Sequence, residues 1–502
     1  MLTLVLAALA TATSPALLVV PLDGRPVRLG VPLPASAVAT GLRLEGRGTL
    51  QWRRLPIGAP DADPVWVELA IVGPPGTVRV CPGGDGPCAD GNGPACVREE
   101  QLRDLPHGSE HVVRWRWRDG TLDERTRTTF TVATTIGDET FAVGEALTVQ
   151  TPGCDERAAV LCRLPRGYFA TIGLLPERRG GGATTETLRA HVQRLLPRLQ
   201  ELPGVRGAGD YGRSGGVVTN LEYDTTLALL RAALALGDVP ALQRAQRAAR
   251  HLRDRDLDVV TGLAFPHGPG HRGGRADPGH TWLRGLLHVG LLTADDGHLQ
   301  AARNLAHAIV ASPPLGSGEA ERLRDYAWPL AELEALLEVA PEPPLARAAD
   351  RYARSIARRF DAVANTWRFG EGEVGGGVYF ERGWLTAGIL LPALRAHLAR
   401  RTDPQLADQV AAATAALLAR IGSNGQGLPT HWRLARGVVF AEHREEGTAE
   451  AACLLDALPV NDLQRLLRRS TVRAAVREFP SPDDPDLPTQ WSLLARCDWL
   501  WR

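Results

Sequence analysis

"NLEYDTTLALLRAALALGDVPALQRAQRAARHL", residues 220–252, decides the fold. Its first half is apolar on nearly every side, whereas the half after Gly-Asp and Pro is apolar only at Leu242, Ala245, Ala249 and Leu252. A helix that is apolar all round is buried, and a helix with one apolar stripe lies on the outside of a domain. The stretch therefore predicts a hairpin made of one inner and one outer helix.

The same scheme recurs along the chain. Further copies lie at 279–309, 325–356, more loosely at 383–421, and at 447–479, and another helix is predicted over 185–202. Five or six consecutive hairpins of this kind predict an inner ring and an outer ring of helices, which is an (α/α) toroid. A straight helical solenoid uses the same unit and is the alternative.

The residues before the helices have a different pattern. Short runs rich in β-branched and aromatic residues, separated by Gly/Pro turns, predict strands, and Val113, Trp115 and Trp117 alternate with arginines as in a half-buried strand. We expect a β-rich sandwich or barrel-like domain over 15–150, a connector over 151–184 and the toroid over 185–502.

The first residues and the cysteines both favour export. Residues 1–14 combine a short apolar run with a small-x-small motif, which is typical of a signal peptide and too short to span a membrane. Three of the seven cysteines lie in "CPGGDGPCADGNGPAC", residues 81–96, where Gly and Pro prevent packing. Their spacing does not match zinc knuckles and favours disulfides. The expected location is secreted or periplasmic.

The charge balance excludes several functions. The 57 basic residues are balanced by 57 acidic ones, so no basic surface for nucleic acid is expected. All the basic residues are arginines, which excludes a P-loop lysine or a Schiff-base lysine.

Three histidines gather just before the second inner helix, in "FPHGPGHRGGRADPGHTW", residues 265–282. A zinc site made by His267, His271 and His280 is one interpretation, but their spacing matches no standard motif. We therefore predict no cofactor, with a metal ion as the alternative.

Alignment of the repeats makes Tyr223, His280 and Tyr326 equivalent, each at the start of an inner helix. Because the inner helices of a toroid run parallel, these residues are expected to surround one mouth of its cavity. The same mouth would collect helix N-termini, which favour an anion such as a carboxylate.

Aromatic, amide and charged side chains at this level are typical of a sugar-binding cleft. Cleavage of a uronate by β-elimination needs a base, an acid for the leaving oxygen and a group that neutralises the enolate-like charge. His280 or His271 is the candidate base, and Tyr223 or Tyr326 the candidate acid. The candidate substrate-binding residues are Asn220, Asp224, Arg272, Trp282, Arg382 and Trp384, with Trp328 at the same level.

Three alternatives are open. Asp224 could be a first-turn acid that stabilises its own helix. A glycoside hydrolase could pair Glu222 or Asp224 with Glu381. A non-catalytic protein that binds carbohydrate at a cell surface could use the same scaffold.

Some stretches resemble the exo-rhamnogalacturonan lyase-like proteins. "VRLGVPLPASAV", residues 27–38, is similar to their opening Gly-x-Pro-x-Pro signature, and residues 209–224 and 279–296 resemble the first hairpins of their toroid. The resemblance implies a RIFT-barrel-like β domain before an (α/α) toroid. It also implies an acidic polysaccharide or oligosaccharide as the partner.

Overall fold

The computed structural model describes residues 17–58, 63–83, 96–117, 120–136, 139–151, 154, 157–164, 166–171, 173–176, 185–199, 212–214, 217–219, 221, 223–268, 274–312, 322–369, 373–374, 377–380, 383–419, 429–435, 438–443 and 496–501. The expected signal peptide over 1–14 and the fifth hairpin over 447–479 lie outside these residues.

Two three-stranded antiparallel sheets form the first β region. One has the order β1-β6-β3 and the other β2-β5-β4. The strands are β1 (Leu18–Leu22), β2 (Val27–Leu33), β3 (Leu42–Glu45), β4 (Thr49–Arg54), β5 (Val65–Val72) and β6 (Gly76–Pro82), with the short helix α1 (Ala35–Ala39) after β2. Both sheets contribute to one buried core, because their apolar side chains meet in the same cluster. The sequence predicts one β-rich domain over 15–150, and these six strands form the first part of that range.

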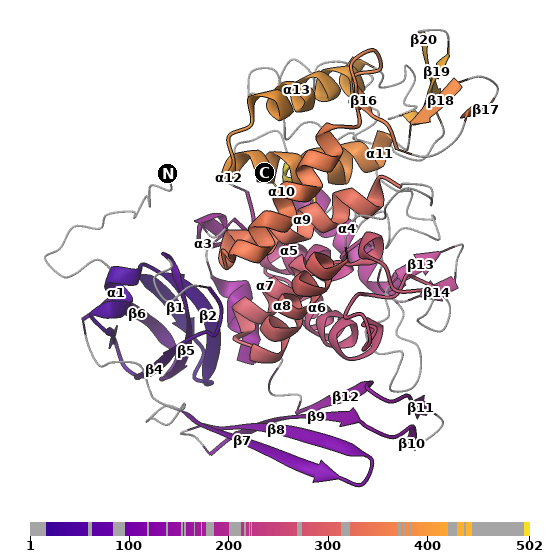
Figure 1. The fold of residues 1–502 in the computed structure, drawn as a ribbon. Helices are drawn as coiled ribbons and strands as arrows, with labels where there is room; N and C mark the ends of the chain where they lie inside the picture. The colour runs from indigo at the N-terminus through magenta and orange to yellow at the C-terminus, as the bar shows by residue number, and fades with distance from the viewer. Residues whose placement is uncertain are drawn as a thin grey trace, which may run out of the picture.

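A second β region forms a separate sheet (Figure 1) that contacts the first, because Val113, Trp115 and Trp117 share a buried apolar cluster with Ala70 of β5. Its four-stranded antiparallel sheet has the order β12-β9-β8-β7, and a hairpin of β10 and β11 extends from it. The strands are β7 (Cys96–Leu105), β8 (Gly108–Trp117), β9 (Leu122–Phe130), β10 (Thr134–Ile136), β11 (Glu139–Phe141) and β12 (Ala146–Gln150). The alternation predicted in β8 is present, since Val113, Trp115 and Trp117 are all buried.

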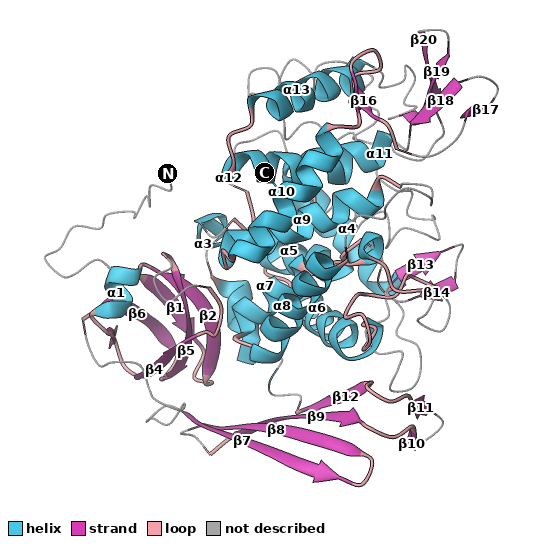
Figure 2. Cartoon of the chain, viewed as in Figure 1, coloured by secondary structure: helices cyan, strands magenta, loops and turns pink. Residues whose placement is uncertain are grey.

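The helices form one body to which both β regions attach, as Figure 2 shows. Before the hairpins lie α3 (Arg166–Thr171) and α4 (Thr185–Leu195). The hairpins are α5 (Thr225–Leu236) with α6 (Val239–His251), α7 (Arg284–Thr293) with α8 (Asp296–Ala311), α9 (Arg324–Val339) with α10 (Pro343–Ala357), and α11 (Gly383–Leu385) and α12 (Leu391–Arg400) with α13 (Pro404–Ala419). The first four predicted hairpins are thus confirmed, and the helical region has the α/α-toroid type of organisation.

The turn inside each of the first two hairpins follows from local chemistry. Gly237 adopts a left-handed conformation with φ of 69° and ends α5, and the next residue, Asp238, accepts a hydrogen bond from the Ala241 amide at the start of α6. Asp295 caps α8 in the same way. Since an N-cap carboxylate satisfies otherwise unpaired amides, the Gly-Asp and Asp-Asp dipeptides place the turns.

The described part of the helical region also contains three small antiparallel sheets of short strands. They are β13 (Gly212–Ser214) with β14 (Val217–Thr219), β15 (Phe360–Asp361) with β16 (Thr366–Trp367), and a four-stranded sheet of β17 (Glu373–Val374), β18 (Gly377–Phe380), β19 (Pro429–Ala435) and β20 (Val438–His443). Among the described helices, none is long and apolar enough to cross a membrane.

The cysteines differ in part from the prediction. Cys81, Cys154 and Cys162 are free thiols, whereas Cys497 is disulfide-bonded. Cys81 lies fully buried in β6 and packs as a small apolar residue. The disulfides expected for residues 81–96 therefore do not include Cys81. Cys88 lies outside the described residues.

The first β region docks on the turn between α7 and α8. A Cβ atom on Gly30 of β2 would overlap the carbonyl oxygen of Leu291, so only glycine permits this approach. Arg28 donates to the carbonyl oxygen of Ala294 at 2.6 Å, and Arg53 forms an ion pair with Asp296 at 2.9 Å. The Gly-x-Pro-x-Pro segment is therefore an attachment point for the helical body.

Candidate functional site

An aromatic cluster occupies the N-terminal side of the inner helices. The ring of Tyr223 is stacked on Trp328 with centroids 6.0 Å apart and meets Trp282 edge-on at 6.3 Å. The rings of Trp282 and Trp328 are also edge to face at 5.9 Å. The sequence thus placed Tyr223, Trp282 and Trp328 at one level correctly.

The backbone at Tyr223 is unusual. Tyr223 and Asp224 both have left-handed conformations, with φ of 56° and 61°. Such conformations are costly for residues other than glycine and occur often at functional sites, where surrounding contacts hold them. Here the stacking of Tyr223 and the hydrogen bonds of Asp224 supply those contacts.

His280 lies beside this cluster and is held by a carboxylate. It ends the short 3₁₀ turn Pro278–His280, and its Nδ1 lies 3.0 and 2.9 Å from the two carboxylate oxygens of Asp277. Because a carboxylate only accepts hydrogen bonds, Nδ1 carries the proton and Nε2 keeps a lone pair. The sequence predicted His280 but missed Asp277, although its position three residues earlier is a usable signal.

Burial decides the charge of His280. Its side chain is 8% exposed. Loss of solvation lowers the pKa of His280 below its ordinary value of 6.5, while the hydrogen bond to Asp277 opposes this shift. At neutral pH the ring is therefore uncharged, which is the state that a general base needs.

Two further groups border His280. The ring of His267 lies 5.6 Å from it, centroid to centroid. Arg322 forms ion pairs with Asp325 at 2.8 Å and with Asp277 at 3.6 Å, so it brings two carboxylates together next to the histidine. Burial raises the pKa of Asp325, whereas Arg322 opposes the shift. The described residues contain no group of three or more His, Cys, Asp or Glu arranged to hold a metal ion.

Both carboxylate oxygens of Asp224 accept hydrogen bonds from backbone amides of the protein. One of its oxygens accepts from the Leu227 amide at 3.1 Å and caps α5, and the other accepts from the Gly285 amide at 2.9 Å in the first turn of α7. Burial, followed by the nearby charge of Glu332, raises the pKa of Asp224 to about 6. The interpretation of Asp224 as a helix-stabilising acid fits these contacts better than substrate binding.

Glu332 and Arg496 complete this arrangement, and sequence reasoning missed both. Glu332 of α9 accepts from the amides of Leu283 at 2.9 Å and Arg284 at 2.8 Å, and its other oxygen accepts from Arg496 at 3.0 Å. The sequence signal that could have identified Glu332 is a glutamate among the apolar residues of an inner helix. The N-terminus of α7 is thus filled by carboxylates of the protein itself, so the predicted site for a substrate anion at this helix end is occupied.

Tyr326 does not join the cluster in the way predicted. Its hydroxyl accepts from Arg359 at 2.8 Å, and its ring packs against Phe369 and Tyr352. Because residues two apart on a helix point about 200° apart, the contact of Trp328 with Tyr223 directs Tyr326 to the opposite face of α9. The repeat alignment identified the correct turn of α9, but Trp328 and not Tyr326 contacts Tyr223.

Asn220, His271, Arg272 and Arg382 lie outside the described residues, as do Glu222 and Glu381 of the hydrolase alternative. Trp384 belongs to α11, but its side chain is not among those described.

Comparisons with known proteins find distant structural likenesses. No family model and no curated protein matches it. Among solved structures, the cellobiose 2-epimerase of Bacillus thermoamylovorans B4167 is 12% identical, with a TM-score of 0.44 over 58% of this chain and 85% of the epimerase.

Two other solved structures give similar values. An inactive variant of the α-1,6-mannanase of Salegentibacter sp. HEL1_6, in complex with α-1,6-mannotetrose, is 11% identical, with a TM-score of 0.43 over 63% of this chain and 99% of the mannanase. A polysaccharide lyase is 13% identical, with a TM-score of 0.45 over 63% of this chain and 98% of the lyase. The three proteins differ in reaction, so a likeness of this degree assigns neither an activity nor a substrate.

Proposed function

We propose that the protein is an exported, carbohydrate-active enzyme that cleaves an acidic polysaccharide by β-elimination at a uronate, with His280 as the base. The observation that carries the proposal is the Asp277–His280 pair beside the aromatic cluster of Tyr223, Trp282 and Trp328. A neutral imidazole with a fixed tautomer and adjacent aromatic rings fits the needs of proton abstraction from a sugar ring.

Nε2 of His280 takes the proton from the carbon next to the carboxylate, the electron pair of that C–H bond forms a C=C bond, and the glycosidic C–O bond breaks. The leaving oxygen receives a proton, for which Tyr223 is the candidate acid on this side of α9. His271 is the alternative base. We assign neutralisation of the enolate-like charge to Asn220 and Arg272, and substrate binding to Arg382 and Trp384. The proposed location is secreted or periplasmic.

A glycoside hydrolase is the second candidate, because Arg322 holds Asp277 and Asp325 at the same place. Asp325, whose pKa is raised by burial, would act as the acid and Asp277 as the base. A binding protein without activity is the third candidate.

The test is incubation of the full chain with uronate-containing polysaccharides, while the absorbance of unsaturated uronates and the formation of reducing ends are both recorded. Absorbance supports the lyase, new reducing ends without absorbance support the hydrolase, and retention of the glycan without either supports the binding protein. His280→Gln should abolish the absorbance, while His307→Gln, a matched change at a half-exposed histidine of α8, should not. If His280→Gln keeps full activity, His280 is not the base.

The pH profile gives a second readout for Asp277. A general base must be deprotonated, and the pKa of His280 is lowered, so the acid limb of the rate should lie below pH 6.5. Asp277→Asn removes a group that raises this pKa, and it should therefore lower the rate and move the acid limb further toward acid. An unmoved limb would assign Asp277 a purely structural role.

A further inference from the structure

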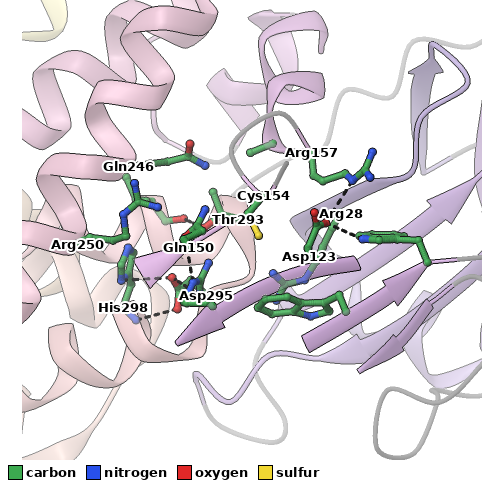
Figure 3. Close-up of a pocket in the computed structure, with 15 residues that line it drawn as sticks. Arg28, Asp123, Gln150, Cys154, Arg157, Gln246, Arg250, Thr293, Asp295 and His298 are labelled. Atoms are coloured by element: carbon green, nitrogen blue, oxygen red, sulfur yellow. Dashed lines mark hydrogen bonds and ion pairs between the residues drawn. The ribbon is translucent and has the colours of Figure 1, made fainter. Parts of the chain in front are cut away.

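The four-stranded sheet of the second β region has one covered edge and one open edge, which are β12 and β7. β12 faces the helical body, because Thr148 donates to a carboxylate oxygen of Asp254 and Gln150 lines the small pocket between this sheet and the helices (Figure 3). In the part of the chain that the structure describes, β7 pairs with β8 alone. Half of the backbone amides and carbonyls of this ten-residue strand can therefore pair with a further strand.

We propose that two copies of this chain associate through β7, so that their sheets join edge to edge across a two-fold axis at Gln101. The two β7 strands run antiparallel, and Gln101 of one copy stands opposite Gln101 of the other. The product is one continuous sheet of eight strands, four from each copy. This association is independent of the proposed catalysis, because His280 belongs to the helical body.

The backbone of β7 limits the registers that such a pair can adopt. Leu105 and Gly108 stand opposite each other across the two-residue turn at 106 and 107, so they exchange both hydrogen bonds of a pair. Because such pairs alternate along a strand, the odd-numbered residues of β7 direct their backbone groups toward β8, and the even-numbered residues direct theirs outward. Outward-directed residues must meet each other in an antiparallel pair. The possible registers therefore differ by steps of two residues.

The charged side chains of β7 complement one another in the register centred on Gln101. Glu99 then stands opposite Arg103 of the second copy, and Arg98 stands opposite Asp104 of the second copy. The two-fold axis repeats both contacts, so four pairs of opposite charge cross the interface. Opposite charges that face each other on neighbouring strands stabilise a sheet, and like charges destabilise it.

Neighbouring registers lack this complementarity. A shift by two residues in one direction brings Glu100 opposite its own copy, and a shift in the other direction brings Glu100 opposite Asp104. Every other register centred between Arg98 and Asp104 likewise places two like charges opposite each other. Charges on an edge strand usually prevent pairing with another chain. Those of β7 prevent it in all of these registers except the one centred on Gln101, so they favour a second copy in a single arrangement.

The charged groups can form these pairs without losing their present partners. Glu99 and Asp104 are exposed and have no ion-pair partner among the described residues. Arg103, whose side chain is 41% exposed, pairs with Glu110 at 3.3 Å. Arg98 is 18% exposed and already bonds two carboxylates. Because a guanidinium has five N–H donors, each arginine can accept a second or third carboxylate, and the more exposed Arg103 should contribute more.

An exposed apolar side chain near the axis fits the same arrangement. Leu102 is 72% exposed, although it lies in the middle of a regular strand. In the register centred on Gln101 the two copies of Leu102 stand diagonally across the axis on one face of the joined sheet. Diagonal neighbours lie about 7–8 Å apart, within reach of long side chains. Association therefore covers apolar surface that a single copy leaves in water.

The first experiment is sedimentation equilibrium on the full chain, in which the wild type should show a monomer–dimer equilibrium. Glu99→Arg and Arg103→Glu each turn two pairs of opposite charge into like pairs and should weaken the dimer about tenfold. The double variant exchanges the charges and should restore the dissociation constant to within about threefold of the wild type. Arg351→Glu makes the same change at an exposed position of α10 and should change nothing. None of these positions is buried, so each variant should fold like the wild type.

Cysteine variants test the register directly. Gln101→Cys places two cysteines opposite each other in a pair without hydrogen bonds, whose Cα atoms lie about 4.5 Å apart. This distance allows a disulfide, so mild oxidation should give a covalent dimer. Glu99→Cys is the matched control, because four residue steps separate it from its copy along the strands, or about 13 Å. The wild type sets the baseline for the native cysteines.

Three results overturn the proposal. The wild type could remain monomeric at submillimolar concentration, which would leave the edge to another partner or to none. The double variant could dimerise no better than the single variants, which would show that Glu99 and Arg103 do not face each other. Glu99→Cys could cross-link as readily as Gln101→Cys, which would exclude an axis at Gln101.

Discussion

The replacement Glu332→Leu tests whether internal carboxylates hold the inner helices in place. Glu332 accepts hydrogen bonds from the backbone amides of Leu283 and Arg284 and from Arg496, and its side chain is fully buried. Leucine leaves two buried amides without an acceptor, at about 1–3 kcal/mol each, and removes the partner of a buried arginine. We expect the free energy of unfolding to fall by about 4 kcal/mol.

The assay is urea unfolding followed by tryptophan fluorescence, combined with hydrogen exchange at the start of α7. The amides of Leu283 and Arg284 should exchange faster in Glu332→Leu than in the wild type. Glu338→Leu changes an exposed glutamate of the same helix and should alter the free energy of unfolding by less than about 0.5 kcal/mol. Equal stability of the two variants would refute the reasoning, because the capping bonds would then contribute nothing.

The remaining predictions concern packing and pH. Gly30→Ala should destabilise the protein by about 3 kcal/mol or more, because the added methyl would lie 2.8 Å from the carbonyl carbon of Leu291, whereas Gly167→Ala has nothing within 4 Å and should be neutral in thermal unfolding. Asp224 has a pKa raised from 3.8 to about 6, so the folded state binds the extra proton between these values and loses stability as the pH rises through them. The wild type should therefore lose about 2 kcal/mol relative to Asp224→Asn between pH 4 and pH 7, and a constant difference between the two proteins would contradict this.

The helical repeat could be predicted because each hairpin carries its own local signals. The inner helix α5 is apolar on all sides, and the Gly237-Asp238 turn encodes both the end of one helix and the start of the next. These signals act within a few residues, so a single sequence contains them. Tyr326 shows the limit, because a repeat offset counted along the chain fixes a helix turn but not the rotation that decides which residue faces inward.

The contacts that define the candidate site are mostly long-range. Arg496 reaches Glu332 and stacks over Trp328, 4.4 Å from the ring centroid, from the far end of the sequence. Trp115 of β8 and Gln246 of α6 line one pocket, although they belong to separate regions of the chain. No local pattern encodes such pairs, and the apolar or amphipathic character of each segment explains only why it is buried.

Helix α7 connects these observations, because its small residues let other parts of the chain approach it closely. A Cβ on Gly285 would overlap a carboxylate oxygen of Asp224, and a Cβ on Gly290 would lie 2.9 Å from the Cβ of His298. Gly30 makes the same kind of approach from β2 near the other end. Since a side chain at any of these positions would push a partner away, α7 sets how closely Asp224, the outer helix α8 and the first β region approach one another.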